Sequence, residues 1–197
     1  MRKNRRRSRN FTGLTFYEDK NNTNTEKLLK ILQWGAYTLM AVFLAVAAFR
    51  CLGFRVSVLG SSMEPDIIAQ QNVLVNKLAY RMGTPERGDV IAFYPGGDEN
   101  IHPSVKRVVA IPGDSVQILN GVLLVNGVPC TLTDTYTNLS YAGLAEDLLM
   151  LEDDEYFVMG DNPDESQDSR SPGIGMVKDT DIIGEVWLVL PAKDTEE

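Results

Sequence analysis

The chain has 197 residues and a formal net charge of −8, and its length suits one compact domain together with one membrane segment. Residues 1–30 hold nine basic and three acidic residues, whereas residues 55–197 hold nine basic and 24 acidic ones. Because an acidic surface repels phosphate groups, this distribution argues against nucleic acid as a partner, while the basic end suits the anionic inner leaflet of a membrane.

A basic tail and a long apolar segment form the first part of the chain. Six of the eight residues 2–9 are basic and residues 1–30 are polar, so we expect a loosely ordered tail. Residues 31–49 carry no charge, and apolar character continues past Arg50 to Phe54. About 20 helical residues cross a hydrocarbon core of about 30 Å. We therefore predict a transmembrane helix over residues 31–54, with residues 1–30 in the cytoplasm and residues 55–197 outside, by the positive-inside rule.

A cleavable secretory signal is an alternative interpretation of the same segment. Its apolar core would be shorter, about 7–15 residues, and would end in small residues. The run Ala45-Val46-Ala47 resembles such an end. Cleavage there would release the following domain from its anchor.

Residues 55–197 show many strand patterns and few helical ones. The turn residues Asn120-Gly121 join two of these runs and predict a type I′ hairpin, and Asn126-Gly127 marks another turn. Residues 141–151 fit either a short helical turn or a loop. The pattern predicts a mostly β fold in which residues 55–197 form one domain of coiled, barrel-like sheets. The predicted strands cover residues 72–77, 89–94, 105–111, 115–119, 122–125, 156–159 and 182–190.

The residues that commonly bind metals are few or poorly spaced. Cys51 and Cys130 belong to no Cys–His cluster for zinc, and a disulfide between them stays an open alternative. The acidic residues from Asp161 to Asp168 would suit a calcium loop, but they lack the Asp-x-Asp-x-Asp-Gly spacing. We therefore expect no metal and no cofactor.

One stretch near the start of the outer domain has the chemistry of a nucleophile. Ser62 lies in Gly60-Ser61-Ser62-Met63-Glu64-Pro65, a few residues beyond the apolar segment. A serine hydroxyl attacks efficiently only when a nearby group accepts its proton. The base is either the single histidine, His102, or a lysine kept neutral by burial among apolar residues.

Lys106 is the best lysine candidate. It is flanked by Val105 and by Val108 to Ile111, which would bury it on a strand, although composition alone would place it at the surface of an edge strand. The other lysines of the outer domain lie in more polar surroundings that suit solvated faces: Lys77, Lys178 and Lys193.

Four stretches together resemble the bacterial type I signal peptidases of the Ser/Lys class. Each stretch alone is common, but their order behind one apolar segment is specific. They are Ser62-Met63-Glu64-Pro65, Arg87-Gly88-Asp89-Val90, Lys106-Arg107 with Pro112-Gly113-Asp114, and the segment from Gly160-Asp161-Asn162 through Ser166 and Asp168 to Arg170.

The resemblance implies a serine endopeptidase of the plasma membrane that removes signal peptides from secreted precursors after Ala-x-Ala-like sites. Ser62 would attack the scissile carbonyl, neutral Lys106 would accept its proton, and water would hydrolyse the acyl-enzyme. The peptide would bind as an added strand beside residues 55–60 and the strand of Lys106. Ser166 aligns with a serine whose hydroxyl positions the lysine amine. The remaining supporting residues by resemblance are Met63, Pro65, Arg107, Asp161, Asp168 and Arg170.

Gly60 is a departure from part of the family. Some members carry a serine two positions before the nucleophile, and its hydroxyl joins the oxyanion hole. Gly60 takes that position here, as in the Gram-positive subgroup, and this leaves the backbone N–H of Ser62 as the donor. We expect Gly60 to serve a close backbone approach or an unusual φ angle.

Three other interpretations stay open. A histidine is the base in the endoplasmic-reticulum and archaeal signal peptidases, so His102 is a rival to Lys106. A membrane-anchored binding protein without catalysis would not need Ser62, Lys106 and the 160–170 segment together. A peptidase specialised for a pilus or for one precursor would carry the same residues. The sequence indicates neither the natural precursors nor the oligomeric state.

Overall fold

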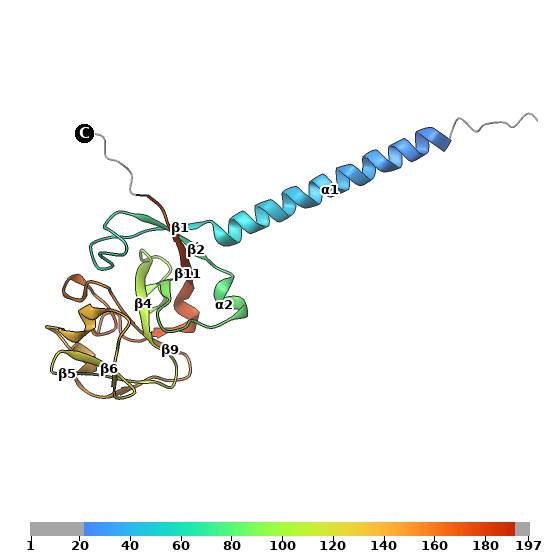
Figure 1. Cartoon of the computed structure of the whole chain (residues 1–197). Helices are drawn as coiled ribbons and strands as arrows, with labels where there is room; N and C mark the ends of the chain where they lie inside the picture. Colours follow the sequence, from blue (N-terminus) through green and yellow to red (C-terminus); the bar gives the residue numbers. More distant parts are fainter. Residues whose placement is uncertain (1–21, 192–197) are drawn as a thin grey trace, which may run out of the picture. The chain divides into compact units, whose positions relative to one another are not determined.

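The computed structural model describes residues 22–191, so the basic residues 2–9 of the predicted cytoplasmic tail and Lys193 lie outside the described part. The chain divides into two units between Ala45 and Val46. Helix α1 spans Asn22–Leu52 (Figure 1). Within it, Thr25–Ala48 is long and apolar enough to cross a membrane. Its apolar side chains are exposed, as suits a helix surrounded by lipid.

A seven-stranded antiparallel sheet is the larger layer of the second unit. Its strand order is β1-β2-β11-β3-β4-β9-β10, and β1, β2 and β11 run beside one another in Figure 1. The prediction of a mostly β fold is therefore confirmed. The strands are β1 (Phe54–Ser57), β2 (Asn72–Asn76), β3 (Val90–Phe93), β4 (Ser104–Ala110), β9 (Glu155–Met159), β10 (Val177–Lys178) and β11 (Ile182–Val189).

A second sheet of four strands has the order β7-β6-β5-β8. Its strands are β5 (Ser115–Leu119), β6 (Val122–Val125), β7 (Val128–Pro129) and β8 (Leu149–Met150). The β5–β6 hairpin turns at Asn120 and Gly121, whose φ angles are 51° and 78°. Two consecutive positive φ angles are what a type I′ turn requires, so the predicted hairpin is confirmed.

Short helical segments connect the strands. Residues 141–151, for which the sequence left a helical turn or a loop open, contain the single turn η3 and then β8. The short segments are α2 (Ala79–Met82), which the sequence patterns did not predict, and the 3₁₀ turns η1 (Pro95–Gly97), η2 (Asp134–Thr137), η3 (Gly143–Glu146), η4 (Pro163–Glu165) and η5 (Asp179–Asp181).

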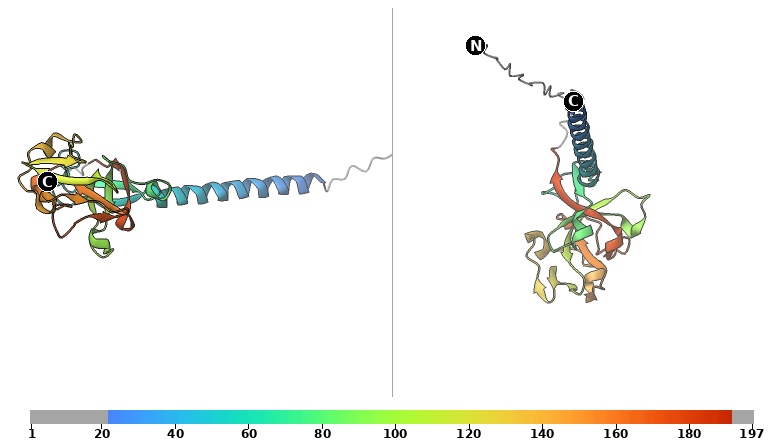
Figure 2. Two further views of the ribbon diagram at one scale, coloured as in Figure 1. Left: turned by 90° about the horizontal axis from the view of Figure 1, so that it is seen from below. Right: turned by 90° about the vertical axis from the view of Figure 1, so that its right-hand side faces the viewer.

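The large sheet is curled rather than flat. Its register shifts twice along β11, at residues 182–184 and 186–188, and once along β4 between Val108 and Ala110. Such bulges bend a strand and increase its twist, and the ribbon of β11 bends along its length in Figure 2. The curl brings strands that are distant in the sheet order, β1 and β4, toward the same pocket, which is described below.

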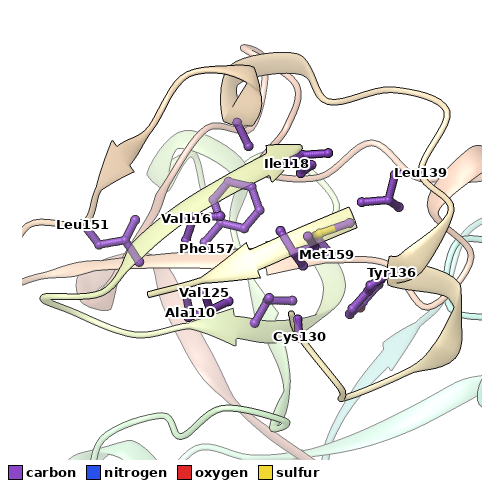
Figure 3. Packing of buried hydrophobic residues seen from close by; sticks show 13 residues of the cluster. Ala110, Val116, Ile118, Val125, Cys130, Tyr136, Leu139, Leu151, Phe157 and Met159 are labelled. Atoms are coloured by element: carbon purple, nitrogen blue, oxygen red, sulfur yellow. The ribbon is translucent and has the colours of Figure 1, made fainter. Parts of the chain in front are cut away.

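Buried apolar side chains join the two sheets. One cluster combines Val109 and Phe157 from the large sheet with Val116 and Leu123 from the small one. Tyr136 and Leu139 lie at one end of this cluster (Figure 3). A separate cluster lies under the segment that follows β1. This second cluster supports the residues of the candidate site.

Candidate active site

The loop between β1 and β2 presents Ser62. Gly60 has a φ of 81°, and a Cβ at this position would meet open space. The left-handed backbone therefore explains the glycine, and a close approach does not. Beyond it, Met63 and Ile67 are buried in the apolar cluster and hold the loop, whereas Pro65 is exposed.

Lys106 reaches this serine from β4. Its Nζ lies 2.8 Å from Ser62 Oγ and 3.1 Å from the carbonyl oxygen of Val105. The Lys106 side chain is buried, with 6% of its surface exposed. Since β4 lies between β3 and β9 in the sheet, the edge-strand position that composition alone favoured for Lys106 is wrong.

The environment of Lys106 favours the neutral amine. Burial lowers the pKa of Lys106, while the carboxylates of Asp168 and Asp161 act in the opposite direction and limit the shift. Among residues 22–191, no carboxylate forms a salt bridge with its Nζ. An amine that is buried without a direct counter-ion can lose its proton more easily than a solvated one, as a general base must.

Arg107 follows Lys106 and makes a different set of contacts. Its Nε and Nη2 donate to the two carboxylate oxygens of Asp161 at 2.7 and 2.6 Å. Nη2 also contacts Asp66 at 2.8 Å, and Nη1 donates to the carbonyl oxygen of Gly88 at 2.9 Å. One guanidinium thus ties together the Ser62 loop, the entry to β3 and the segment after β9.

Asp168 and Arg170 form a buried ion pair in the segment after β9. Arg170 Nε and Nη2 donate to Asp168 at 2.8 and 2.9 Å. The same guanidinium donates to the carbonyl oxygens of Tyr141 and Pro163. The Asp168 carboxylate accepts further bonds from the backbone N–H groups of Gly160 and Arg170. These contacts fix the 160–170 segment against the rest of the domain.

The 160–170 segment packs directly against the loop that carries Ser62. A Cβ on Gly160 would collide with the carbonyl oxygen of Ser62 and with the Ser166 hydroxyl, so only glycine fits there. Asn162 N–H donates to Ser62 O at 3.0 Å, and its side-chain amide donates to Ser61 O at 3.3 Å. The Ser166 hydroxyl is buried and has no hydrogen-bond partner among the described residues, so its predicted contact with the lysine amine stays a prediction.

A small pocket of about 100 Å³ opens beside the Ser62–Lys106 pair. It brings together the end of β1 and the start of β4. His102, the rival base, lies at this pocket with an exposed ring, and its Nδ1 is 2.9 Å from the carbonyl oxygen of Pro103. The lining residues are Val58, Leu59, Ser62, His102, Pro103, Ser104, Val105 and Lys106.

The remaining lysines and the cysteine lie elsewhere. Lys77 Nζ lies 3.6 Å from the centre of the Phe54 ring, and Lys178 pairs with Asp154 at 3.1 Å. Cys130 is buried as a free thiol, so the alternative of a Cys51–Cys130 disulfide is wrong.

Motif residues that received no specific role from the sequence also contribute. The carboxylate of Asp114 binds the Arg87 guanidinium, the Ile111 N–H and the Asn126 amide. Burial alone would raise the pKa of Asp114, but these hydrogen bonds outweigh it and the pKa lies below its usual value. Arg87, Asp114, Gly160 and Asn162 could have been identified from the sequence because they lie in the family motifs. Asp66 lies in no motif, so the sequence did not single it out.

Comparisons with known proteins agree with these motifs. A family model described as signal peptidase, peptidase S26, matches residues 31–190. Signal peptidase I P of Bacillus subtilis subsp. natto is 36% identical over 166 residues, which cover 81% of this chain and 88% of the relative. Signal peptidase I T of Bacillus subtilis strain 168 is 34% identical over 178 residues, which cover 84% and 91%. A crystal structure of a signal peptidase I from Enterococcus faecalis V583 is similar at 29% identity and a TM-score of 0.40, covering 52% of this chain and 97% of its own.

Proposed function

The chain belongs to the signal peptidase I family, peptidase S26, as its motifs predict, and we propose that Ser62 and neutral Lys106 perform its peptide-bond hydrolysis. Removal of signal peptides by a serine protease is the activity of this family. The observation that carries the proposal is the 2.8 Å contact between Lys106 Nζ and Ser62 Oγ. Both side chains are buried, and the pKa of Lys106 is lowered by that burial.

The reaction begins with proton transfer between the paired side chains. Ser62 Oγ bonds to the scissile carbonyl carbon while its proton passes to Lys106 Nζ. The resulting ammonium then gives this proton to the leaving amine as the C–N bond breaks, and the signal peptide is left as an ester on Ser62. Lys106, neutral again, accepts a proton from water as it attacks the ester carbonyl carbon. The ammonium then returns this proton to Ser62 Oγ as the ester bond breaks, which frees the peptide and the serine.

The negative charge of the tetrahedral intermediate needs a donor. The Ser62 N–H has no acceptor among the described residues, and it belongs to the same residue as the attacking oxygen. The carbonyl of Ser62 is held by Asn162, which fixes the orientation of the adjoining backbone. This N–H therefore suits the oxyanion hole, with Gly60 in the place of a hydroxyl donor.

The substrate would bind as an extended strand with small side chains near the cut. β1 pairs with β2 alone in the described sheet, and the pairing of β4 with β9 begins only at Arg107. Residues 104–106 and β1 therefore offer free backbone groups on either side of the pocket. A pocket of about 100 Å³ suits alanine and excludes large side chains, as cleavage after Ala-x-Ala-like sites requires.

The apolar helix bears on where in the cell this activity takes place. The family and the apolar helix indicate a membrane-anchored protein. The sequence predicted a span over residues 31–54, but helix α1 ends at Leu52 and Phe54 belongs to strand β1. In our proposal this helix crosses the membrane, the basic residues 1–30 lie in the cytoplasm, and the β domain up to residue 197 is the catalytic domain outside the plasma membrane. Anchoring enzyme and precursor in the same bilayer raises their effective concentration.

The remaining site residues act through the two reacting side chains. Met63 anchors the nucleophile loop and Pro65 continues its turn. Ser166 lies next to Gly160 and the Ser62 backbone, and in our proposal its hydroxyl positions the lysine amine. The ion pairs Arg107–Asp161 and Asp168–Arg170 fix the surrounding segments.

Incubation of the detergent-solubilised protein with a signal-bearing precursor tests the proposal. We expect cleavage after the Ala-x-Ala-like site by the native protein and none by Ser62→Ala or Lys106→Ala. Lys178→Ala is the matched control, since this lysine pairs with Asp154 at the surface. Full cleavage by Ser62→Ala would disprove the assignment.

A further inference from the structure

The pocket beside Ser62 has a mixed wall. Val58, Leu59, Pro103 and Val105 contribute its apolar side chains. Apart from the reacting pair, its polar side chains are those of His102 and Ser104. In a space of about 100 Å³, a bound side chain shares the pocket with these groups.

His102 has one nitrogen engaged and one available. Its Nδ1 lies 2.9 Å from the carbonyl oxygen of Pro103. A carbonyl only accepts hydrogen bonds, so Nδ1 carries the proton and the neutral ring has an acceptor at Nε2. No residue within 22–191 forms a hydrogen bond with that Nε2.

The position of the nucleophile identifies the substrate residue that enters this pocket. Attack brings the scissile carbonyl carbon to Ser62 Oγ, so the residue that supplies this carbonyl places its side chain in the adjoining space. Ser62 and Lys106 both line that space. The side chain that meets His102 therefore belongs to the residue immediately before the cut.

We propose that His102 is a specificity-determining residue that favours serine over alanine immediately before the scissile bond. The inference rests on the proposed function. A serine side chain adds only one oxygen to alanine, so it fits the same small space. Its hydroxyl donates to the neutral Nε2, and it accepts from the ring if both nitrogens carry protons, so the contact survives either charge state.

The test uses the full-length protein and two precursors that differ only in alanine or serine before the cut. The quantity measured is the ratio of kcat/KM for the serine precursor to kcat/KM for the alanine precursor. His102→Phe keeps a ring and removes both nitrogens, and we expect the ratio to fall about two- to tenfold, the value of one neutral hydrogen bond. His102→Gln, which restores a polar group at similar reach, should recover most of the ratio. Ser104→Ala, a matched change in the same wall, should leave the ratio as it is.

Three results would overturn the inference. The first is an unchanged ratio in His102→Phe, and the second is a fall in Ser104→Ala instead. The third is loss of cleavage of both precursors in a folded His102→Phe protein, which would make the imidazole part of the chemistry. Failure of the proposed function gives a different pattern, because Ser62→Ala would then cleave both precursors, and the inference would fall with it.

Discussion

Two buried regions of the domain contain ionisable side chains, one with a direct counter-ion and one without. Asp168 and Arg170 lie together with two direct N–O contacts, and their side chains are 0% and 2% exposed. Lys106 is also buried, but its amine meets a hydroxyl and a carbonyl instead of a carboxylate. Burial with a partner keeps a charge and fixes structure, whereas burial without one lowers the pKa of a lysine. In our proposal, one region therefore supports the fold and the other supplies the base.

The largest effect should come from removing the unpaired amine. Lys106→Met should lower kcat/KM by about 10²–10⁴-fold, the usual contribution of a general base. The melting temperature should stay the same or rise, because the variant no longer buries a polar group that favours water. Precursor cleavage measures the change in kcat/KM, and thermal unfolding of the same preparation measures the change in melting temperature. A large loss of stability would mean that the amine supports the fold as the ion pair does.

Removing one partner of the buried ion pair should mainly lower the stability of the fold. Arg170→Met should cost about 3–5 kcal/mol of unfolding free energy, since it leaves the Asp168 charge buried and unpaired. Denaturant unfolding followed by tryptophan fluorescence measures this cost. The double variant Asp168→Leu with Arg170→Met should recover much of it, because no isolated charge remains. A double variant no more stable than the single one would contradict this explanation.

The pH dependence of cleavage should report the state of Lys106. In the proposed mechanism the neutral amine is the base, so the rate should rise as pH increases through the lowered pKa of Lys106. Asp161 opposes that lowering, so Asp161→Asn should move the rising limb to lower pH. Initial rates across a pH series, with chemistry limiting, give the midpoint. A midpoint that moves upward in Asp161→Asn would contradict a lysine base.

The smallest effect should come from an ion pair in water. Lys178 and Asp154 are 50% and 42% exposed, and solvent weakens such pairs. Asp154→Ala should therefore leave both the cleavage rate and the melting temperature within experimental error. A clear loss of stability would show that an exposed ion pair also stabilises this domain, contrary to our expectation.

Local patterns predicted most of the strands, because β-branched runs and Asn-Gly turns act over a few residues. The run at 115–119 and the turn at Asn120 are examples, and the structure has both. Four strands were missed. β7, β8 and β10 have two residues each, and a pair of residues carries no detectable alternation. β1 begins at Phe54, which the sequence assigned to the end of the membrane helix. The interior position of β4 was also beyond local patterns, because its neighbours β3 and β9 come from distant parts of the chain.

The pairing of Ser62 with Lys106 was predicted from four motifs taken together, and not from either residue alone. Spacing along the chain could not place Ser62 in contact with Lys106, which lies 44 residues away in the sequence. The collision that keeps Gly160 a glycine depends on Ser62 and Ser166, and so became visible only with the fold. The contact between Asp66 and Arg107 was likewise visible only in the folded structure. A single carboxylate in a loop forms no sequence pattern from which its partner could be predicted.

Lys106 and Arg107 are consecutive residues of one strand, and they point to opposite faces of the sheet. A deletion of one residue in β4 before Lys106 would shift Arg107 into the position of Lys106, so that a guanidinium that keeps its proton would meet the serine. On this strand, Lys106 faces the serine, whereas its neighbour Arg107 faces the ion pair that supports the fold. Length changes should be harmless in the exposed turn at 98–101, which precedes the strand, and fatal to hydrolysis a few residues later.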